Sequence, residues 1–212
     1  MAIIAKNTGQ NRELVPQGNY VARCYQMIEI GTVKEEYKGV PKEHQKVRIG
    51  WEFPLELRVF DEAKGEQPLV ISNKYTVSMG DKANLRKVLE SWRGKAFTEE
   101  EAKAFDITKL LGVPCFLNVI HKTSEDGSKT YANIASVTPL PKGIECPPQV
   151  NPMFVLSYDE FDYKKFMDLP DFIKEEMEVT PEFKVATTSQ EAHEDEPQHL
   201  TGKDEQESDL PF

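Results

Sequence analysis

The chain has 212 residues, of which 39% are hydrophobic and 29% charged, so it has room for one substantial core or two small ones. Its three cysteines form no Cys-x-x-Cys pair, which argues against a disulfide framework or a zinc site and favours a reducing cytoplasm. No run approaches the roughly 20 apolar residues of a membrane span, and we expect no membrane association, no metal and no cofactor.

The acidity of the chain is concentrated at its C-terminal end. Residues 1–156 carry 21 basic and 19 acidic side chains, residues 157–187 carry 4 and 9, and residues 188–212 carry 1 and 8. Although the whole chain has a net charge of −10, residues 1–156 have a slight excess of positive charge. This asymmetry keeps polyanions among the candidate partners of the body, although the total alone argues against them.

Three stretches near the N-terminus are typical of strands. The second alternates strictly between apolar and polar residues, which indicates a half-buried strand with Trp51 and Phe53 on its apolar face. Pro54 indicates an edge or a bulge near the end of that strand. The expected boundaries are strands at 19–30, 45–57 and 69–78, with a basic loop rich in glycine and proline at 31–44.

Helical signals follow the third strand. Asp81 is expected to cap a helix that ends at Gly94, and Thr98 with Glu101 forms a capping box for a short second helix. Two more strands flank an Asp-Gly turn at 126–127, which is a hairpin signal. The expected boundaries are helices at 81–92 and 98–105, a helical turn at 106–111, and strands at 113–122 and 130–140.

Beyond residue 140 the strand pattern stops. Three prolines within 147–152 mark a linker, and Thr180 is expected to cap a last helical turn after two short helices at 159–167 and 171–178. From Ala186 onward, low hydrophobicity and high charge predict disorder. The chain therefore divides into a body, 1–140, an extension with short helices, 141–187, and a disordered acidic tail, 188–212.

The order of these elements predicts a mainly β fold. Three strands, helical segments and two more strands make up the connectivity of the OB-fold, a five-stranded Greek-key barrel. We therefore expect an OB-fold barrel with helices between its third and fourth strands, followed by the extension and the tail. In this fold the second and third strands, with the loops joining strands 1–2 and 4–5, form the usual groove for oligonucleotides.

The positions that would line this groove carry basic and aromatic side chains. Single-stranded nucleic acid needs positive charge along its phosphates and flat side chains on which its bases stack. Both kinds occur in the expected first loop, in the second and third strands, and around the last hairpin. The candidate DNA-binding residues are Lys34, Tyr37, Lys38, Lys42, His44, Lys46, Arg48, Lys74, Tyr75, Lys122, Lys129 and Tyr131.

These residues also have plainer interpretations. Trp51 and Phe53 share a face with the aliphatic residues Val47, Ile49 and Leu55 and are assigned to the core. Tyr75 shares a face with apolar neighbours, so a core position and a base contact stay equally open. Tyr37 is either a stacking ring or a simply exposed loop tyrosine, and on a lone strand the lysines would suit a solvated face.

The last residues combine acidic and apolar side chains at the C-terminus. Glu207 and Asp209 lead into Leu210, Pro211 and Phe212, so that an aromatic ring and an α-carboxylate belong to one residue. Such a peptide suits a hydrophobic pocket with an Arg or Lys rim, and these five are the candidate protein-docking residues. The alternative is a solubilising tail whose last residues happen to be apolar.

Together the body and the tip resemble single-stranded DNA-binding proteins. The tip Ser208-Asp209-Leu210-Pro211-Phe212 is similar to the run of aspartates followed by Ile-Pro-Phe that ends the bacterial family, with Leu for Ile and fewer acids. The segments YTVSM at 75–79 and KANLRKVLESWRGK at 82–95 resemble the OB-fold single-stranded DNA-binding proteins of tailed bacteriophages. The resemblance covers about residues 1–140 and the tip, and 141–187 has no counterpart.

The resemblance implies sequence-independent binding and protection of single-stranded DNA during phage DNA replication, recombination and repair in the host cytoplasm. It also implies that the tip recruits replication and recombination proteins, with Phe212 as anchor and Asp209 and Glu207 steering. The tethered acidic tail can compete for the protein's own groove. The oligomeric state stays open between monomer and dimer.

Catalysis is not indicated by the sequence. A nuclease would need carboxylates clustered around Mg²⁺, and the acids of the body are scattered. No G-x-x-x-x-G-K-[ST] phosphate loop occurs either. We therefore expect a protein that is not an enzyme. The alternatives are an adaptor that binds proteins of a replication complex without direct DNA contact and, less favoured, a nuclease.

Overall fold

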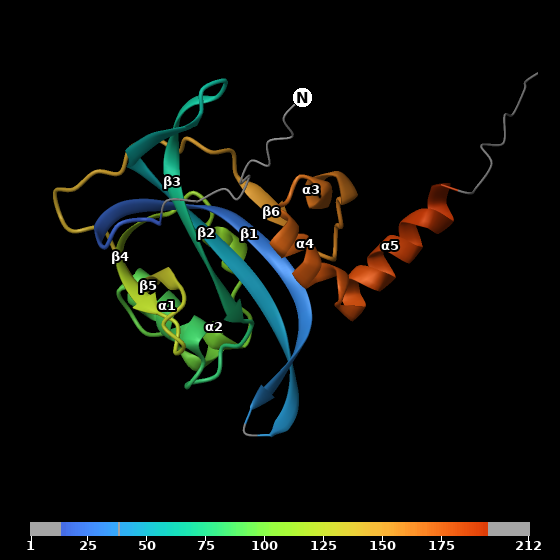
Figure 1. The fold of residues 1–212 in the computed structure, drawn as a ribbon. Coiled ribbons are helices and arrows are strands. Elements are labelled where there is room, and N and C mark those ends of the chain that lie inside the picture. The colour runs from blue at the N-terminus through green and yellow to red at the C-terminus, as the bar shows by residue number, and fades with distance from the viewer. Residues whose placement is uncertain (1–13, 38, 195–212) are drawn as a thin grey trace, which may run out of the picture.

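The computed structural model describes residues 14–37 and 39–194. As expected, the fold is mainly β, and five antiparallel strands form a curled half-barrel (Figure 1). The strands lie in the order β3-β2-β1-β4-β5 across the sheet. Their bounds are β1 Gly18–Tyr37, β2 Val40–Asp61, β3 Gly65–Thr76, β4 Pro114–Thr123 and β5 Thr130–Thr138.

The inner face of the half-barrel carries a first hydrophobic core. The alternation in β2 buries Trp51 and Phe53 completely, at 0% exposure, which confirms their assignment to the core. The pairing of β2 with β3 shifts register between Phe53 and Leu57, so the ladder is irregular at Pro54, where the sequence predicts an edge or a bulge. The other side of β1, β2 and β3 is called the outer face below.

The prediction of a basic loop at 31–44 is wrong. These residues extend β1 and β2 into a paired arm. The antiparallel register continues from Gly31 opposite Lys46 to Tyr37 opposite Val40. Gly39 and Gly31 belong to the glycines expected to interrupt the strands. Gly39 lies in the turn of the arm with φ 77°, whereas Gly31, with φ 99°, lies at a register shift within β1. The arm is therefore a projecting hairpin, seen at the lower edge of Figure 1.

Three short helical elements lie between β3 and β4: α1 Asn84–Arg93, α2 Glu99–Lys103 and the 3₁₀ helix η1 Ile107–Leu110. Gly94 ends α1 with φ 69°, and the capping box of Thr98 and Glu101 is present, as expected. Asp81 does not cap α1, because its carboxylate instead accepts a hydrogen bond of 2.6 Å from the guanidinium of Arg86. Helix α1 packs against both edge strands, β3 and β5.

The extension packs against the outer face of β1. It consists of β6 Phe154–Leu156, α3 Tyr163–Met167 and α4 Asp171–Glu178, and α5 Pro181–Glu194 follows. Ile28 and Ile30 of β1, both at 0% exposure, form a second core with Phe166 and Met177. Strand β6 pairs in parallel with β1 at Gln26–Ile28, beyond the residues that pair with β4.

Helix α5 continues past Ala186, where the sequence predicts disorder, and corrects that prediction up to residue 194. Its first turn is fixed to β1, because Glu182 accepts a hydrogen bond of 2.9 Å from the backbone N–H of Thr32. Residues 195–212, the rest of the predicted tail, lie outside the described residues. No helix in 14–37 or 39–194 has the length and apolarity that crossing a membrane requires.

The linker before β6 is held on the outer face by a buried carboxylate. Glu52 of β2 is 0% exposed and accepts hydrogen bonds from the backbone N–H groups of Val150, at 2.8 Å, and Asn151, at 2.7 Å. Arg23 of β1 donates a further hydrogen bond of 2.8 Å to the carbonyl of Pro147. The outer face is therefore polar where the linker crosses it and apolar where the helices cover it.

Gly31 tests how closely the extension is docked. A Cβ at this position would lie 2.9 Å from both Glu182 Oε2 and Thr180 Oγ1. We expect Gly31→Ala to cost about 1–2 kcal/mol for the left-handed backbone and about 1–3 kcal/mol more for overpacking. Urea unfolding followed by tryptophan fluorescence and far-UV circular dichroism measures this loss.

Gly39→Ala is the matched control, since Gly39 also has a positive φ but nothing lies within 4 Å of its added Cβ. The Gly39→Ala variant should lose only the part of the unfolding free energy that comes from the left-handed backbone. Equal losses at Gly31 and Gly39 would contradict a close contact between β1 and the start of α5.

Candidate functional site

Two basic residues face each other on the outer face. Arg48 of β2 and Lys74 of β3 are direct cross-strand partners, and the alternation that buries Ile49 and Tyr75 turns them outwards. Directly opposite residues have Cβ atoms about 4.5–5.5 Å apart, and like charges at such positions repel each other. The pair therefore favours an anion beside it.

In the structure this anion comes from the extension. Glu176 of α4 lies 3.3 Å from a guanidinium nitrogen of Arg48 and 3.3 Å from Nζ of Lys74. The ring of Phe172, one turn earlier on α4, has the Cζ of Arg48 5.2 Å from its centre. Arg48 also donates a hydrogen bond of 3.2 Å to the hydroxyl of Ser72. One carboxylate faces two cations here, which leaves a local excess of one positive charge.

Lys46 lies next along β2 and is only 8% exposed. Its ammonium group donates hydrogen bonds to Glu35, at 2.7 Å, and to the hydroxyl of Thr76, at 3.0 Å. The hydrogen bond from Lys46 holds the pKa of Glu35 below its ordinary value. Lys46 thus fixes the base of the arm to β3, and its charge is already engaged.

The arm carries three more of the predicted residues. Lys34 is exposed and lies 3.4 Å from Glu43 across the arm, Lys42 is exposed, and His44 is half-buried. The segment 31–44 holds three lysines and three glutamates, so the arm is nearly neutral. The side chain of Tyr37 and all of Lys38 lie outside the described residues.

A third group lies at the far end of β4 and β5. Lys122 and Tyr131 are cross-strand partners on the outer side of this hairpin, and Tyr131 is 49% exposed. Lys129 is exposed in the turn before β5, which contains Gly127 with φ 71° as the Asp-Gly signal predicts. An exposed ring opposite a lysine offers a stacking surface with a charge beside it.

Tyr75 does not belong to the site. It is 2% exposed and forms part of the first core, and burial raises the pKa of its hydroxyl. The two-residue period predicts that Tyr75 and Ile71 share a face but does not say which face is inside, which is why both interpretations stayed open. The predicted docking residues Glu207, Asp209, Leu210, Pro211 and Phe212 lie outside the described residues.

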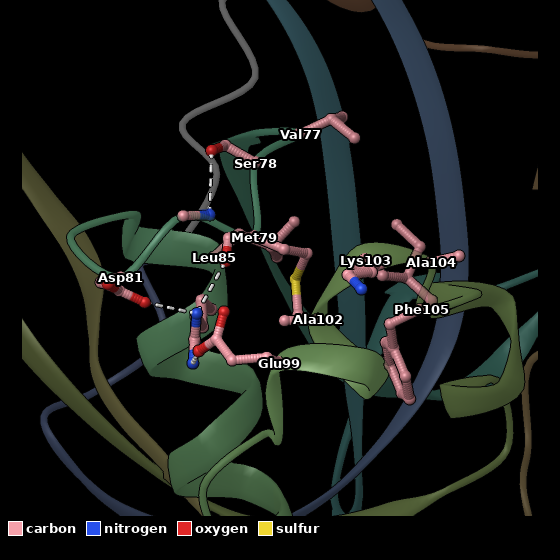
Figure 2. A pocket seen from close by; sticks show the side chains of 13 residues that line it. Val77, Ser78, Met79, Asp81, Leu85, Glu99, Ala102, Lys103, Ala104 and Phe105 are labelled. Atoms are coloured by element: carbon pink, nitrogen blue, oxygen red, sulfur yellow. Dashed lines mark hydrogen bonds and ion pairs between the residues drawn. The ribbon is translucent and has the colours of Figure 1, made fainter.

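A pocket of about 640 Å³ opens between the end of β3, α1 and α2 (Figure 2). Arg86, which lines the pocket, is engaged by the hydrogen bonds that it donates to Asp81, to Glu90 and to the carbonyl of Met79. The pocket is lined by residues from 77–86, from the end of β3 to the start of α1, and by residues from 99–107, from α2 to the start of η1. The cations described above are not among the residues that line this pocket.

The sequence reasoning missed the contribution of the extension. Phe172 and Glu176 fall in the short helix expected at 171–178, to which the sequence assigns no role in the site. A signal was available, because Ile173 and Met177 at i and i+4 define the buried face of that helix. What the sequence could not supply is the place on the half-barrel where the neighbouring face of α4 would lie.

Within 14–37 and 39–194, no group of three or more His, Cys, Asp or Glu side chains is placed to hold a metal ion. In comparisons with known proteins, no family model and no curated protein matches the chain.

The hydrogen bond between Lys46 and Glu35 predicts a pH dependence. Because the pKa of Glu35 is lowered in the folded state, its stabilising effect is complete above the ordinary value of 4.5 and is lost as the pH falls below it. We expect Glu35→Gln to lower the unfolding free energy at pH 7 by at most about 1 kcal/mol. Urea unfolding at several pH values should show the difference from wild type shrinking on acidification.

Glu36→Gln is the control, since Glu36 is the exposed neighbour and loses the same charge. A pH-dependent difference of the same size in both variants would attribute the effect to net charge and not to the contact with Lys46.

Proposed function

We propose that the protein binds single-stranded DNA without sequence preference, through the outer face of β2 and β3 of an OB-fold barrel. The strand order β3-β2-β1-β4-β5 supports this fold, because the OB-fold is a five-stranded, partly open barrel that binds oligonucleotides on its second and third strands. The position of α1 against both edge strands is compatible with a helix that plugs one end of the barrel.

The observation that carries the proposal is the cross-strand pair of Arg48 and Lys74. Their side chains are 12% and 30% exposed, they point outwards, and they share a single carboxylate. A phosphate supplies the charge that this pair still lacks. The exposed Tyr131 and its neighbours Lys122 and Lys129 extend the basic and aromatic surface at the other flanking hairpin.

The role of such binding is protection of the strand during phage DNA replication, recombination and repair in the host cytoplasm, as the sequence resemblance implies. The acidic tip with Leu210, Pro211 and Phe212 would recruit replication and recombination proteins. The body and the tip would thus have separate tasks.

A labelled oligo(dT) is expected to bind the full-length protein with an affinity that falls as salt rises. Four or five phosphate contacts would give a slope of about −3 in a plot of log affinity against log salt. Lys74→Gln should weaken binding and reduce the slope by about 0.7, the share of one phosphate contact. Fluorescence anisotropy at several NaCl concentrations measures both quantities.

Lys64→Gln in the turn between β2 and β3 is the control, because it removes the same charge far from Arg48 along the hairpin. Equal effects of the two variants would place the DNA elsewhere. No binding of the wild-type protein at low salt would contradict the proposal and favour the protein adaptor.

The tip makes a separate prediction. Phe212→Ala removes the terminal ring, so it should leave oligo(dT) affinity unchanged while abolishing pull-down of replication proteins such as polymerase, primase or helicase components. Ser208→Ala, which changes the tip without touching its apolar end, is the control. Unchanged pull-down with Phe212→Ala would refute the docking role of the tip.

A further inference from the structure

Helix α4 is anchored on one face and presents another to the proposed groove. Ile173 and Met177 turn into the second core, at 3% and 0% exposure. Phe172 and Glu176 are also one turn apart, so they share the neighbouring face. This face is directed at Arg48, as the ring contact and the ion pair show.

Phe172 is an aromatic side chain that the packing of the extension does not use. It is 45% exposed, and it is not part of the second core. Its ring lies beside the guanidinium of Arg48. A base that stacks on this ring would place its own phosphate near Arg48, which is the combination that single-strand binding sites use.

Glu176 occupies the place that a phosphate would take. Its carboxylate accepts charge-assisted contacts from both cations, and phosphate oxygens accept from the same donors in the same geometry. The guanidinium is only partly used, because Nε of Arg48 is buried without a hydrogen-bond partner among the described residues. Since α4 is held by the second core, only the side chain of Glu176, which is 31% exposed, needs to turn away.

We propose that Arg48, Lys74 and Phe172 form one nucleotide subsite, in which a phosphate displaces Glu176 from the two cations while the base stacks on Phe172. The proposal rests on single-stranded DNA binding by the outer face and adds that the extension supplies part of the site. Glu176 is an internal competitor, which holds the two cations in place when no strand is bound and lowers the affinity when one arrives.

The test compares two charge-equivalent variants of α4 by anisotropy with oligo(dT) at fixed salt. Glu176→Gln should tighten binding about fivefold, because the competing ion pair is removed. Glu175→Gln removes the same charge from an exposed position on the same helix and should change affinity by less than about twofold. Thermal unfolding of both variants checks that the half-barrel is intact.

The stacking contact is tested separately. Phe172→Leu keeps an apolar side chain but loses the ring, and should weaken oligo(dT) binding by at least about fivefold. Tyr163→Leu is the control, since Tyr163 is a 47% exposed ring of α3 that packs on Phe166. Photocrosslinking of the wild-type protein to an oligonucleotide containing 5-bromodeoxyuridine should give a crosslinked peptide that includes 171–178.

The outcomes separate the subsite from the proposed function. Failure of the wild-type protein to bind oligo(dT) at low salt would overturn both. If the wild-type protein binds, equal affinities for Glu176→Gln and Glu175→Gln overturn the competition. Equal effects of Phe172→Leu and Tyr163→Leu, with crosslinks only outside α4, overturn the stacking contact. In these two cases DNA binding by the outer face still stands.

Discussion

Strand β1 has apolar side chains on both of its faces, and the rest of the structure depends on this constraint. Met27 faces the first core, whereas Ile28 and Ile30 are fully buried in the second. A half-barrel alone would leave both isoleucines in water, at a cost of about 1.5–3 kcal/mol each. The extension is therefore an integral part of the fold. Its position follows from β1, since β6 pairs where β4 has ended and the helices cover the exposed side.

The extension and the linker leave only part of the outer face exposed to solvent. The linker fills one region, where the buried carboxylate of Glu52 is satisfied by N–H groups of Val150 and Asn151. The helices fill the region over β1. What remains is a strip along β2 and β3 with α4 as its wall, and Arg48 and Lys74 lie in that strip. A polar surface that would be broad on an isolated barrel is thus narrowed to a place where two cations, one carboxylate and one ring meet.

Local signals in the sequence predicted the parts of the fold that depend on neighbouring residues. The alternation around Trp51, the capping box at Thr98 and the glycine that ends α1 all appear as expected, because their causes lie within a few residues. The arm was mistaken for a loop, since Gly31 marks an irregularity inside a strand and not its end. For the site, the sequence supplied the cations of β2 and β3 but not their partner. Arg48 and Glu176 are 128 residues apart, and only the packing of two apolar faces brings them together.

The charge distribution makes the proposed site for a polyanion compatible with an acidic chain. Screening limits interactions between exposed charges to about 8 Å at physiological ionic strength, so distant acids contribute little at the outer face. The side chains of Arg48 and Lys74 are only partly exposed, so their electrostatic interactions are stronger than those of fully exposed lysines. The local balance of two cations against Glu176 then matters more than the total of −10. In the proposed subsite the competing carboxylate belongs to the same chain, so its competition with a phosphate would not depend on protein concentration.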